Sequence, residues 1–235
     1  LFHGCIPLDE EGRLQSVTIA GADYSGKALL DKLDEIANRA YFIQPGAEKD
    51  YAADYMWYLW SGARSPLYGK DKMAFFERYF LADRELQKEN YNAYYHYSEQ
   101  AEVCGRILEM FGLDPEKGHI INGHVPVKIK NGEKPVKAGG RLFVIDGGIS
   151  KAYQKATGIA GYTLIYDSHS LNLAEHRPFI AGESEHTPEI HLVERLDRRA
   201  NISDTDKGAE LLEQINDLRE LLIAYRSGEI KESGR

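Results

Sequence analysis

The spacing of apolar residues changes along the 235-residue chain, and these changes limit the folds that it can adopt. At about residues 27–112 apolar side chains recur at helical spacing, whereas short apolar runs typical of strands follow from residue 119 onward. Strands are also predicted before the helices. The pattern therefore predicts a mixed α/β (α+β) fold with a helical insertion. The predicted helices are 27–42, 51–60, 72–81 and 98–111, and the predicted strands fall within 1–8, 15–20, 119–125, 125–130, 140–146, 161–167 and 171–175.

The C-terminal part of the chain differs from both of these regions. Residues 183–204 are polar, and we expect them to form a loop that makes few core contacts. Residues 206–226 follow as a predicted helix, in which apolar residues are spaced four, three, four and three apart. This heptad spacing indicates a seam that packs on a partner subunit, giving a homo-oligomer, or back on the body of the protein. The seam residues are Leu211, Ile215, Leu218, Leu222 and Tyr225.

Composition excludes some classes of partner. The formal net charge of −8 argues against a general nucleic-acid binder, which normally carries a basic face. A local basic pocket or a metal could still attract a small anionic substrate. No apolar stretch approaches the roughly 20 residues of a membrane span. Cys5 and Cys104 are the two cysteines, and we expect free thiols in a cytoplasmic protein.

One glycine-rich segment resembles a phosphate-binding loop. GADYSGKA, residues 21–28, follows a predicted strand and precedes a predicted helix, as the P-loop does. The strand-like LFVID, which ends on Asp146, could supply the acidic residue that helps to hold magnesium. However, Ala28 stands where the P-loop needs a hydroxyl as magnesium ligand. A nucleotide-binding regulatory module is therefore an alternative that this position disfavours.

Two strand-like segments each present a histidine beside a glycine. FHG places His3 near the chain start, and NGHVP places His124 after the Ile120–Ile121 pair. Taken singly, each imidazole can be a structural residue with two hydrogen bonds in a core. If the two strands are neighbours in one sheet, the pair instead predicts metal ligands. The other histidines are interpreted as surface or structural residues: His96, His119, His169, His176, His186 and His191.

Four segments together carry a resemblance to a known family. They are LFHGCIP, LWSGARSPLYGK, NGHVPVK and VIDGGISKAYQKATGIAGYTLIY, in this order. The chain resembles the bacterial class III fructose-1,6-bisphosphatases of the calcineurin-like metallophosphoesterase superfamily. The resemblance covers roughly residues 1–180, and the continuous string from Asn122 to Tyr166 is long and specific.

The resemblance implies a fold and a metal centre. Residues 1–182 would form the C-terminal half of a metallophosphoesterase β-sandwich flanked by helices, and residues 183–235 a polar linker and C-terminal helix. In this superfamily, ligands from two halves of the domain hold two metals, here implied to be manganese, with His3 and His124 at the matching positions. The Gly-Asp-x-x-Asp and Gly-Asn-His patterns of the first half are missing from the sequence, and Asp146-Gly147-Gly148 does not replace them. We therefore expect a C-terminal fragment that needs the N-terminal half as its partner and is inactive alone.

The implied reaction is hydrolysis of the 1-phosphate of fructose 1,6-bisphosphate by a metal-activated water, a step of gluconeogenesis. A sugar bisphosphate needs two cationic subsites, and phosphoryl charge is usually met by Arg or Lys. Two alternative hypotheses to the sugar bisphosphatase stay open: a metallophosphatase acting on a phosphoprotein, and the nucleotide-binding module described above. The candidate phosphate-binding residues are Arg64, Lys70, Lys128 and Lys151.

Overall fold

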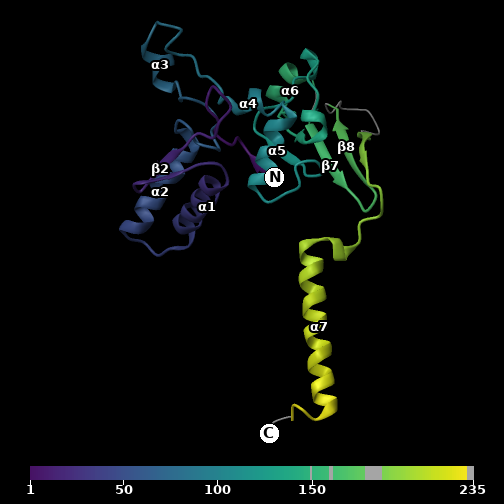
Figure 1. Cartoon of the computed structure of the whole chain (residues 1–235). Coiled ribbons are helices and arrows are strands. Elements are labelled where there is room, and N and C mark those ends of the chain that lie inside the picture. Colours follow the sequence, from purple (N-terminus) through teal and green to yellow (C-terminus); the bar gives the residue numbers. More distant parts are fainter. Residues whose placement is uncertain (149, 159–160, 178–186, 232–235) are drawn as a thin grey trace. The chain divides into compact units, whose positions relative to one another are not determined.

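The computed structural model describes residues 1–148, 150–158, 161–177 and 187–231 (Figure 1). These residues form two compact units, which are treated separately here. The first comprises residues within 1–163 and 175–188, and the second comprises residues within 164–174 and 189–235. The mixed α/β fold class is confirmed, whereas the pairing of sheets into a sandwich and the domain division at residues 182 and 183 stay predictions.

Two long helices and a hairpin make up the N-terminal lobe of the first unit (Figure 1). The helices pack against each other, and both contribute to one apolar cluster with Ile19 of the hairpin. Leu29, Leu33 and Ile36 recur at helical spacing on the buried face of the first helix, which confirms the helix predicted at 27–42. The elements are β2 (Val17–Ile19), β3 (Ala22–Tyr24), α1 (Gly26–Phe42) and α2 (Ala47–Ser61).

The glycine-rich segment GADYSGKA does not form a phosphate-binding loop. Ala20 and Gly21 have φ of 50° and 85°, which closes a tight hairpin between β2 and β3. The rest of the segment is a paired strand and the first turn of α1, where the Lys27 N–H donates to the Met110 sulfur. Backbone N–H groups needed to surround a phosphate are thus used in strand pairing, and the P-loop interpretation is wrong.

Shorter helices follow along the chain. The helix predicted at 72–81 extends only over Phe75–Phe80, and the one predicted at 98–111 begins at Ala101. Cys104 lies on the buried face of the helix that begins at Ala101. Cys104 and Cys5 are both buried and free, as predicted. Burial raises the pKa of Cys5 to about 12 and that of Cys104 to about 11, so both stay neutral thiols. The helices are α3 (Phe75–Phe80), α4 (Tyr94–Tyr97) and α5 (Ala101–Met110).

A four-stranded sheet of order β1-β4-β6-β5 lies in the first unit. β1, β4 and β6 are parallel, and β5 runs antiparallel to β6. The strand predicted within 125–130 is wrong: Pro126 has no N–H for a ladder, and Ile129–Asn131 form a 3₁₀ turn. The strands are β1 (Phe2–His3), β4 (Ile120–Gly123), β5 (Val136–Lys137) and β6 (Leu142–Val144).

A three-stranded sheet of order β7-β8-β9 follows, and its last strand was not predicted. Glu189–Arg195 alternates Ile190 and Leu192 with polar residues, so the predicted loop at 183–204 is wrong there. Residues 178–186, also within or beside that prediction, lie outside the described residues. The strands are β7 (Gly161–Tyr166), β8 (Ser170–His176) and β9 (Glu189–Arg195).

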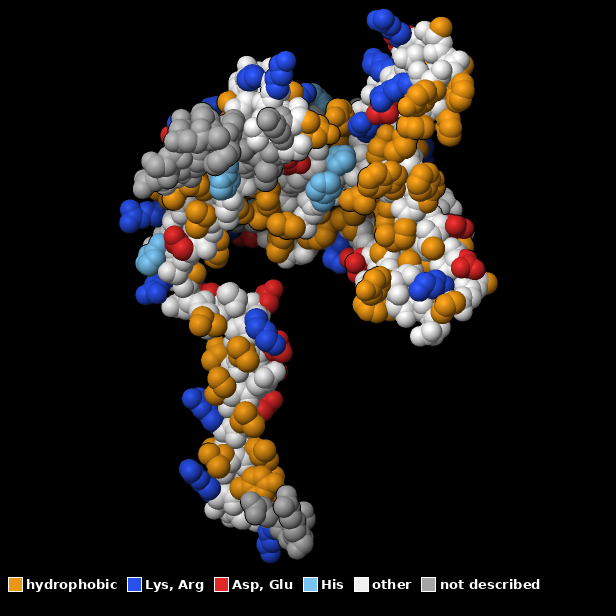
Figure 2. Space-filling model, turned by 180° about the vertical axis from the view of Figure 1, so that it is seen from behind, with side chains coloured by type: hydrophobic (Ala, Val, Ile, Leu, Met, Phe, Trp, Pro, Cys, Tyr) orange, Lys and Arg blue, Asp and Glu red, His pale blue; other side chains and the backbone are white. Residues whose placement is uncertain are grey.

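The helix predicted at 206–226 is confirmed as α7 (Asp206–Ser227). The Thr205 hydroxyl accepts the Gly208 N–H and caps its N-terminus. Apolar side chains remain exposed along α7 (Figure 2), among them Leu218 and Ile223, each 64% exposed. In the part of the chain that the structure describes, no helix is long and apolar enough to cross a membrane.

Candidate metal centre

The two histidines predicted from the glycine-flanked motifs lie side by side. β1 and β4 are parallel neighbours, with His3 opposite Gly123, so His3 and His124 leave the sheet at the same edge. Their ring centroids are 4.9 Å apart, and the rings meet edge to face at 81°. The predicted adjacency is confirmed, and the role of the two imidazoles as metal ligands stays a prediction.

Glycine and backbone strain shape this edge of the sheet. A Cβ at Gly123 would lie 3.3 Å from the His3 ring, so a side chain there would crowd the imidazole. His124 has a φ of 90°, which is rare for a residue with a side chain. Such strain costs about 1–3 kcal/mol and persists where surrounding contacts enforce it, often at functional sites.

The environment of His124 favours a neutral ring. Burial, together with the neighbouring His3, lowers the pKa of His124, and the hydrogen bond to the Tyr68 carbonyl only partly opposes this. The ring nitrogen Nε2 lies 3.0 Å from the Tyr68 carbonyl oxygen. A neutral imidazole keeps one nitrogen lone pair, which is the form that binds a metal.

Two polar residues at the same edge were not predicted from the sequence to lie beside the two histidines. Asp146 follows β6, the third parallel strand, and its carboxylate accepts the N–H groups of His124 at 3.2 Å and Gly148 at 2.9 Å. The Asn122 side chain, 4% exposed, donates to the carbonyls of Phe2 and Gly4 and so joins β1 to β4. The sequence LFVID indicates a strand that ends on an acidic residue, which could have pointed to Asp146 as a site residue. It was not selected because the glycines after it do not match a known ligand motif.

The donor set fits part of a metal site. Two imidazoles suit a divalent transition metal, and Asp146 provides a nearby carboxylate that is already engaged by backbone N–H groups. Among the described residues, no three or more His, Cys, Asp or Glu side chains are grouped closely enough to hold a metal ion. His3 and His124 can therefore supply two ligands, but the described residues do not supply a dinuclear set.

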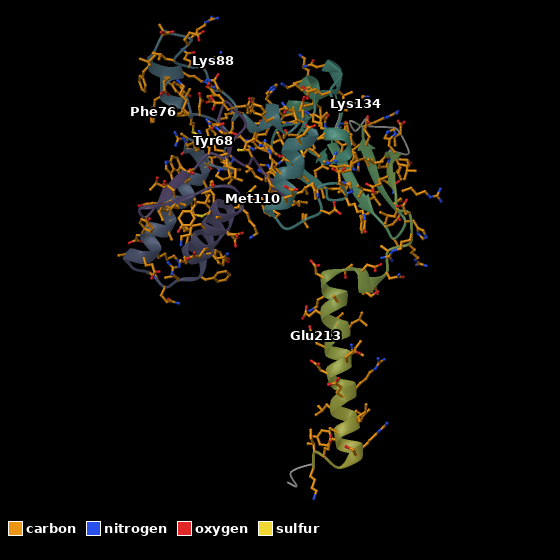
Figure 3. All side chains as sticks on the ribbon, in the orientation of Figure 1. Tyr68, Phe76, Lys88, Met110, Lys134 and Glu213 are labelled. Carbon is orange, nitrogen blue, oxygen red and sulfur yellow. The ribbon has the colours of Figure 1, made fainter. Side chains whose placement is uncertain are left out.

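Residues 62–70, here named the Ser65 loop, pack against the ends of β1 and β4. The Pro66 carbonyl accepts the Cys5 N–H at 2.7 Å, and the Tyr68 carbonyl lies against His124. Tyr68 is labelled in Figure 3. The loop carries Arg64 and Lys70, two of the predicted phosphate-binding residues. Both line a cavity of about 670 Å³, together with Asp71, Asn90, Tyr91 and several residues of the segment 8–15.

The four predicted basic residues differ in their surroundings. Lys70 is held by Glu89 at 2.7 Å and lies over the ring of Tyr91. Lys128 is exposed and does not belong to the described lining of the cavity that holds Arg64. Lys151 begins α6 (Lys151–Thr157), and its side chain lies outside the described part of the structure. Among the described side chains of this set, the structure thus brings Arg64 and Lys70 together.

Glu89 fixes Lys70, and its replacement tests this contact. Burial alone would raise the pKa of Glu89, but hydrogen bonds from Lys70 and the Ala74 N–H, with the charge of Arg78, hold it below its usual range. A carboxyl group whose pKa is lower in the folded state than in the unfolded state stabilises the fold at pH values above its ordinary pKa of about 4.3. This stabilisation is lost as the pH falls through the lower pKa of the folded state. Glu89→Gln should therefore cost about 1–2 kcal/mol of unfolding free energy at neutral pH.

Urea unfolding from pH 7 down to about pH 3, below the ordinary Glu pKa of about 4.3, checks this expectation. The gap between Glu89→Gln and the unchanged protein should narrow toward the acid end. Glu85→Gln, at an exposed position of the same segment, should cost little at any pH. A pH-independent cost at Glu89 would show that its charge does not matter.

Comparisons with known proteins agree with this arrangement of motifs. The family model of the Firmicute fructose-1,6-bisphosphatases matches residues 1–227. The chain is 51% identical to a fructose-1,6-bisphosphatase class 3 of Clostridioides difficile (strain 630) and 53% identical to one of Clostridium botulinum (strain Alaska E43 / Type E3). Each alignment covers 99% of this chain but 36% of the relative, so the chain spans about a third of their length. No solved structure matches it significantly. The chain belongs to the Firmicute fructose-1,6-bisphosphatase family.

Proposed function

We propose that this chain supplies two metal ligands and part of the substrate pocket to a phosphatase that removes the 1-phosphate of fructose 1,6-bisphosphate. The observation that carries the proposal is the pairing of His3 and His124 at one sheet edge, with the Ser65 loop packed beside them. The names of the relatives at 51% and 53% identity support the substrate.

We assign the metal as manganese, held by the imidazoles of His3 and His124. When bound, two such cations lower the pKa of a water and neutralise phosphate charge. The curated relatives are longer than this chain, and we place the remaining ligands in residues beyond these 235. The Arg64 guanidinium would bind a substrate phosphate, while the ammonium group of Lys70, paired with Glu89, can donate a further hydrogen bond within the same cavity.

The cavity also suits the sugar. Its lining combines two cations with carboxylates and amides, among them Asp71 and Asn90, which can hydrogen-bond sugar hydroxyls. The free, buried thiols of Cys5 and Cys104 are compatible with a reducing compartment. We accordingly place the enzyme in the cytoplasm and its reaction in gluconeogenesis.

Phosphate release by the intact protein tests the substrate. Fructose 1,6-bisphosphate should be hydrolysed with manganese and not after chelation, and re-addition of manganese should restore the rate. A phosphopeptide should be hydrolysed far more slowly. Activity on the phosphopeptide without activity on the sugar bisphosphate would keep the metallophosphatase and overturn the sugar substrate.

We also propose that α7 mediates self-association through its heptad seam. The seam side chains are exposed, with Leu218 at 64%. Leu218→Glu should therefore lower the oligomer mass in light scattering. Ile223→Glu is the matched control, because Ile223 is equally exposed at 64% but lies outside the seam. Equal behaviour of the two variants, or a monomeric starting protein, would contradict the proposal.

A further inference from the structure

A chain of hydrogen bonds runs from the end of α2 through the Ser65 loop to His124. The Ser65 hydroxyl donates to the Leu59 carbonyl at 2.7 Å and accepts the Tyr68 N–H at 3.3 Å. The Tyr68 carbonyl, on the other side of that same residue, lies 3.0 Å from Nε2 of His124. Ser65 is thus linked to the histidine through a single residue.

The position of the Tyr68 carbonyl is set by several contacts at once. Ser65 is fully buried, and its own carbonyl accepts the Gly69 N–H at 2.9 Å. The Pro66 carbonyl is held by the Cys5 N–H, which fixes the loop to the strand β1. Gly69 has a φ of 65°, and a Cβ there would lie 2.5 Å from the Tyr95 hydroxyl, so this path of the loop favours glycine at that position.

A backbone carbonyl can only accept a hydrogen bond. A neutral imidazole bonded to it through Nε2 must therefore carry its proton on Nε2, which leaves the lone pair on Nδ1. His119 gives the opposite case in the same chain, because its Nδ1 lies 3.0 Å from the Gly140 carbonyl. His119 should accordingly carry its proton on Nδ1.

We propose that Ser65 is a positioning residue: by fixing the Tyr68 carbonyl, it holds His124 in the Nε2–H tautomer and leaves Nδ1 as the nitrogen that binds a cation. Partners that orient the far nitrogen of a ligating histidine commonly change metal affinity by about 10–100-fold when they are removed. The inference rests on the proposed function for the cation, whereas the tautomer can be measured without any metal.

Long-range ¹H–¹⁵N NMR of the metal-free, ¹⁵N-labelled chain reads the tautomer directly, above the ordinary imidazole pKa of about 6.5. His119→Gln and His124→Gln assign the signals. His124 should show a protonated Nε2 and an unprotonated Nδ1, and His119 the reverse. A protonated Nδ1 on His124 would overturn the inference.

Ser65→Ala tests the role of the serine. The preference of His124 for Nε2–H should fall by about fivefold, the equilibrium effect of weakening one neutral hydrogen bond, and Ser65→Cys should restore part of it. Ser61→Ala is the matched control, because the Ser61 hydroxyl donates to the Trp57 carbonyl within α2. An unchanged tautomer ratio in a folded Ser65→Ala chain would remove Ser65 from the account.

If Ser65→Ala does not fold, the tautomers of the unchanged chain still decide whether the Tyr68 carbonyl orients His124. The inference about the tautomer and the proposed function can be contradicted independently of each other. The Nε2–H tautomer with no manganese effect on phosphate release would contradict the proposed function alone. The opposite tautomer in an active enzyme would contradict the inference alone.

Discussion

His124→Ala in the intact protein is expected to reduce phosphate release from fructose 1,6-bisphosphate by more than about 100-fold, because a metal ligand is lost. Folding should change little. His124 already has a φ of 90°, so alanine adds no backbone strain. The losses are the hydrogen bond to the Tyr68 carbonyl, worth about 1 kcal/mol, and the edge-to-face contact with the His3 ring. Excess manganese should restore part of the rate. Steady-state kinetics at several manganese concentrations and a thermal melt measure both effects.

His119→Ala is the control for this experiment. His119 is also half-buried, donates a hydrogen bond from Nδ1 to the Gly140 carbonyl, and packs edge-on against Phe143 at 5.2 Å. Its replacement should lower stability by a similar or larger amount and leave the rate per folded molecule unchanged. If the two variants lose activity equally, His124 has no special role. If His124→Ala unfolds the protein while sparing the rate, it is a core histidine.

Gly4→Ala is expected to give the largest loss of stability, at least about 3 kcal/mol. Gly4 has a φ of 93°, and an added Cβ would overlap the Pro66 carbonyl oxygen. That oxygen cannot move away freely, because it accepts the Cys5 N–H at 2.7 Å. The glycine after His3 is therefore needed for the Ser65 loop to approach β1. Urea unfolding of the variant measures the loss.

Gly21→Ala separates the steric effect from the backbone effect. Gly21 has a similar φ of 85°, but no atom lies within 4 Å of an added Cβ. Only the backbone preference is lost, at about 1 kcal/mol. A Gly4→Ala variant no less stable than Gly21→Ala would show that the close contact between β1 and the loop is absent in solution.

The histidine pair could be predicted because local sequence carried the signal. An apolar run followed by a glycine-flanked histidine marks a strand end, and two such ends meet when the strands are parallel neighbours. The place of Asp146 beside the histidines could not be predicted, because it is not encoded in the local sequence. Its strand is recognisable as LFVID, but its position at the same edge depends on the order β1-β4-β6, which arises from tertiary packing.

The errors in the predicted elements also have local causes. GADYSGKA was interpreted by the spacing of its glycines, whereas the left-handed backbone at Ala20 and Gly21 closes a hairpin. Residues 125–130 are apolar enough for a strand, but Pro126 interrupts the ladder. In β9 the high content of charged residues hid the alternation of Ile190 and Leu192. The Ser65 loop, which joins distant segments, has no periodic pattern that could place it.

Anomalous diffraction at the manganese edge, from crystals of the intact protein grown with manganese, tests the central claim most directly. The account predicts manganese peaks within coordination distance of the imidazoles of both His3 and His124. Manganese bound elsewhere, with these two rings contacting only protein atoms, would contradict it.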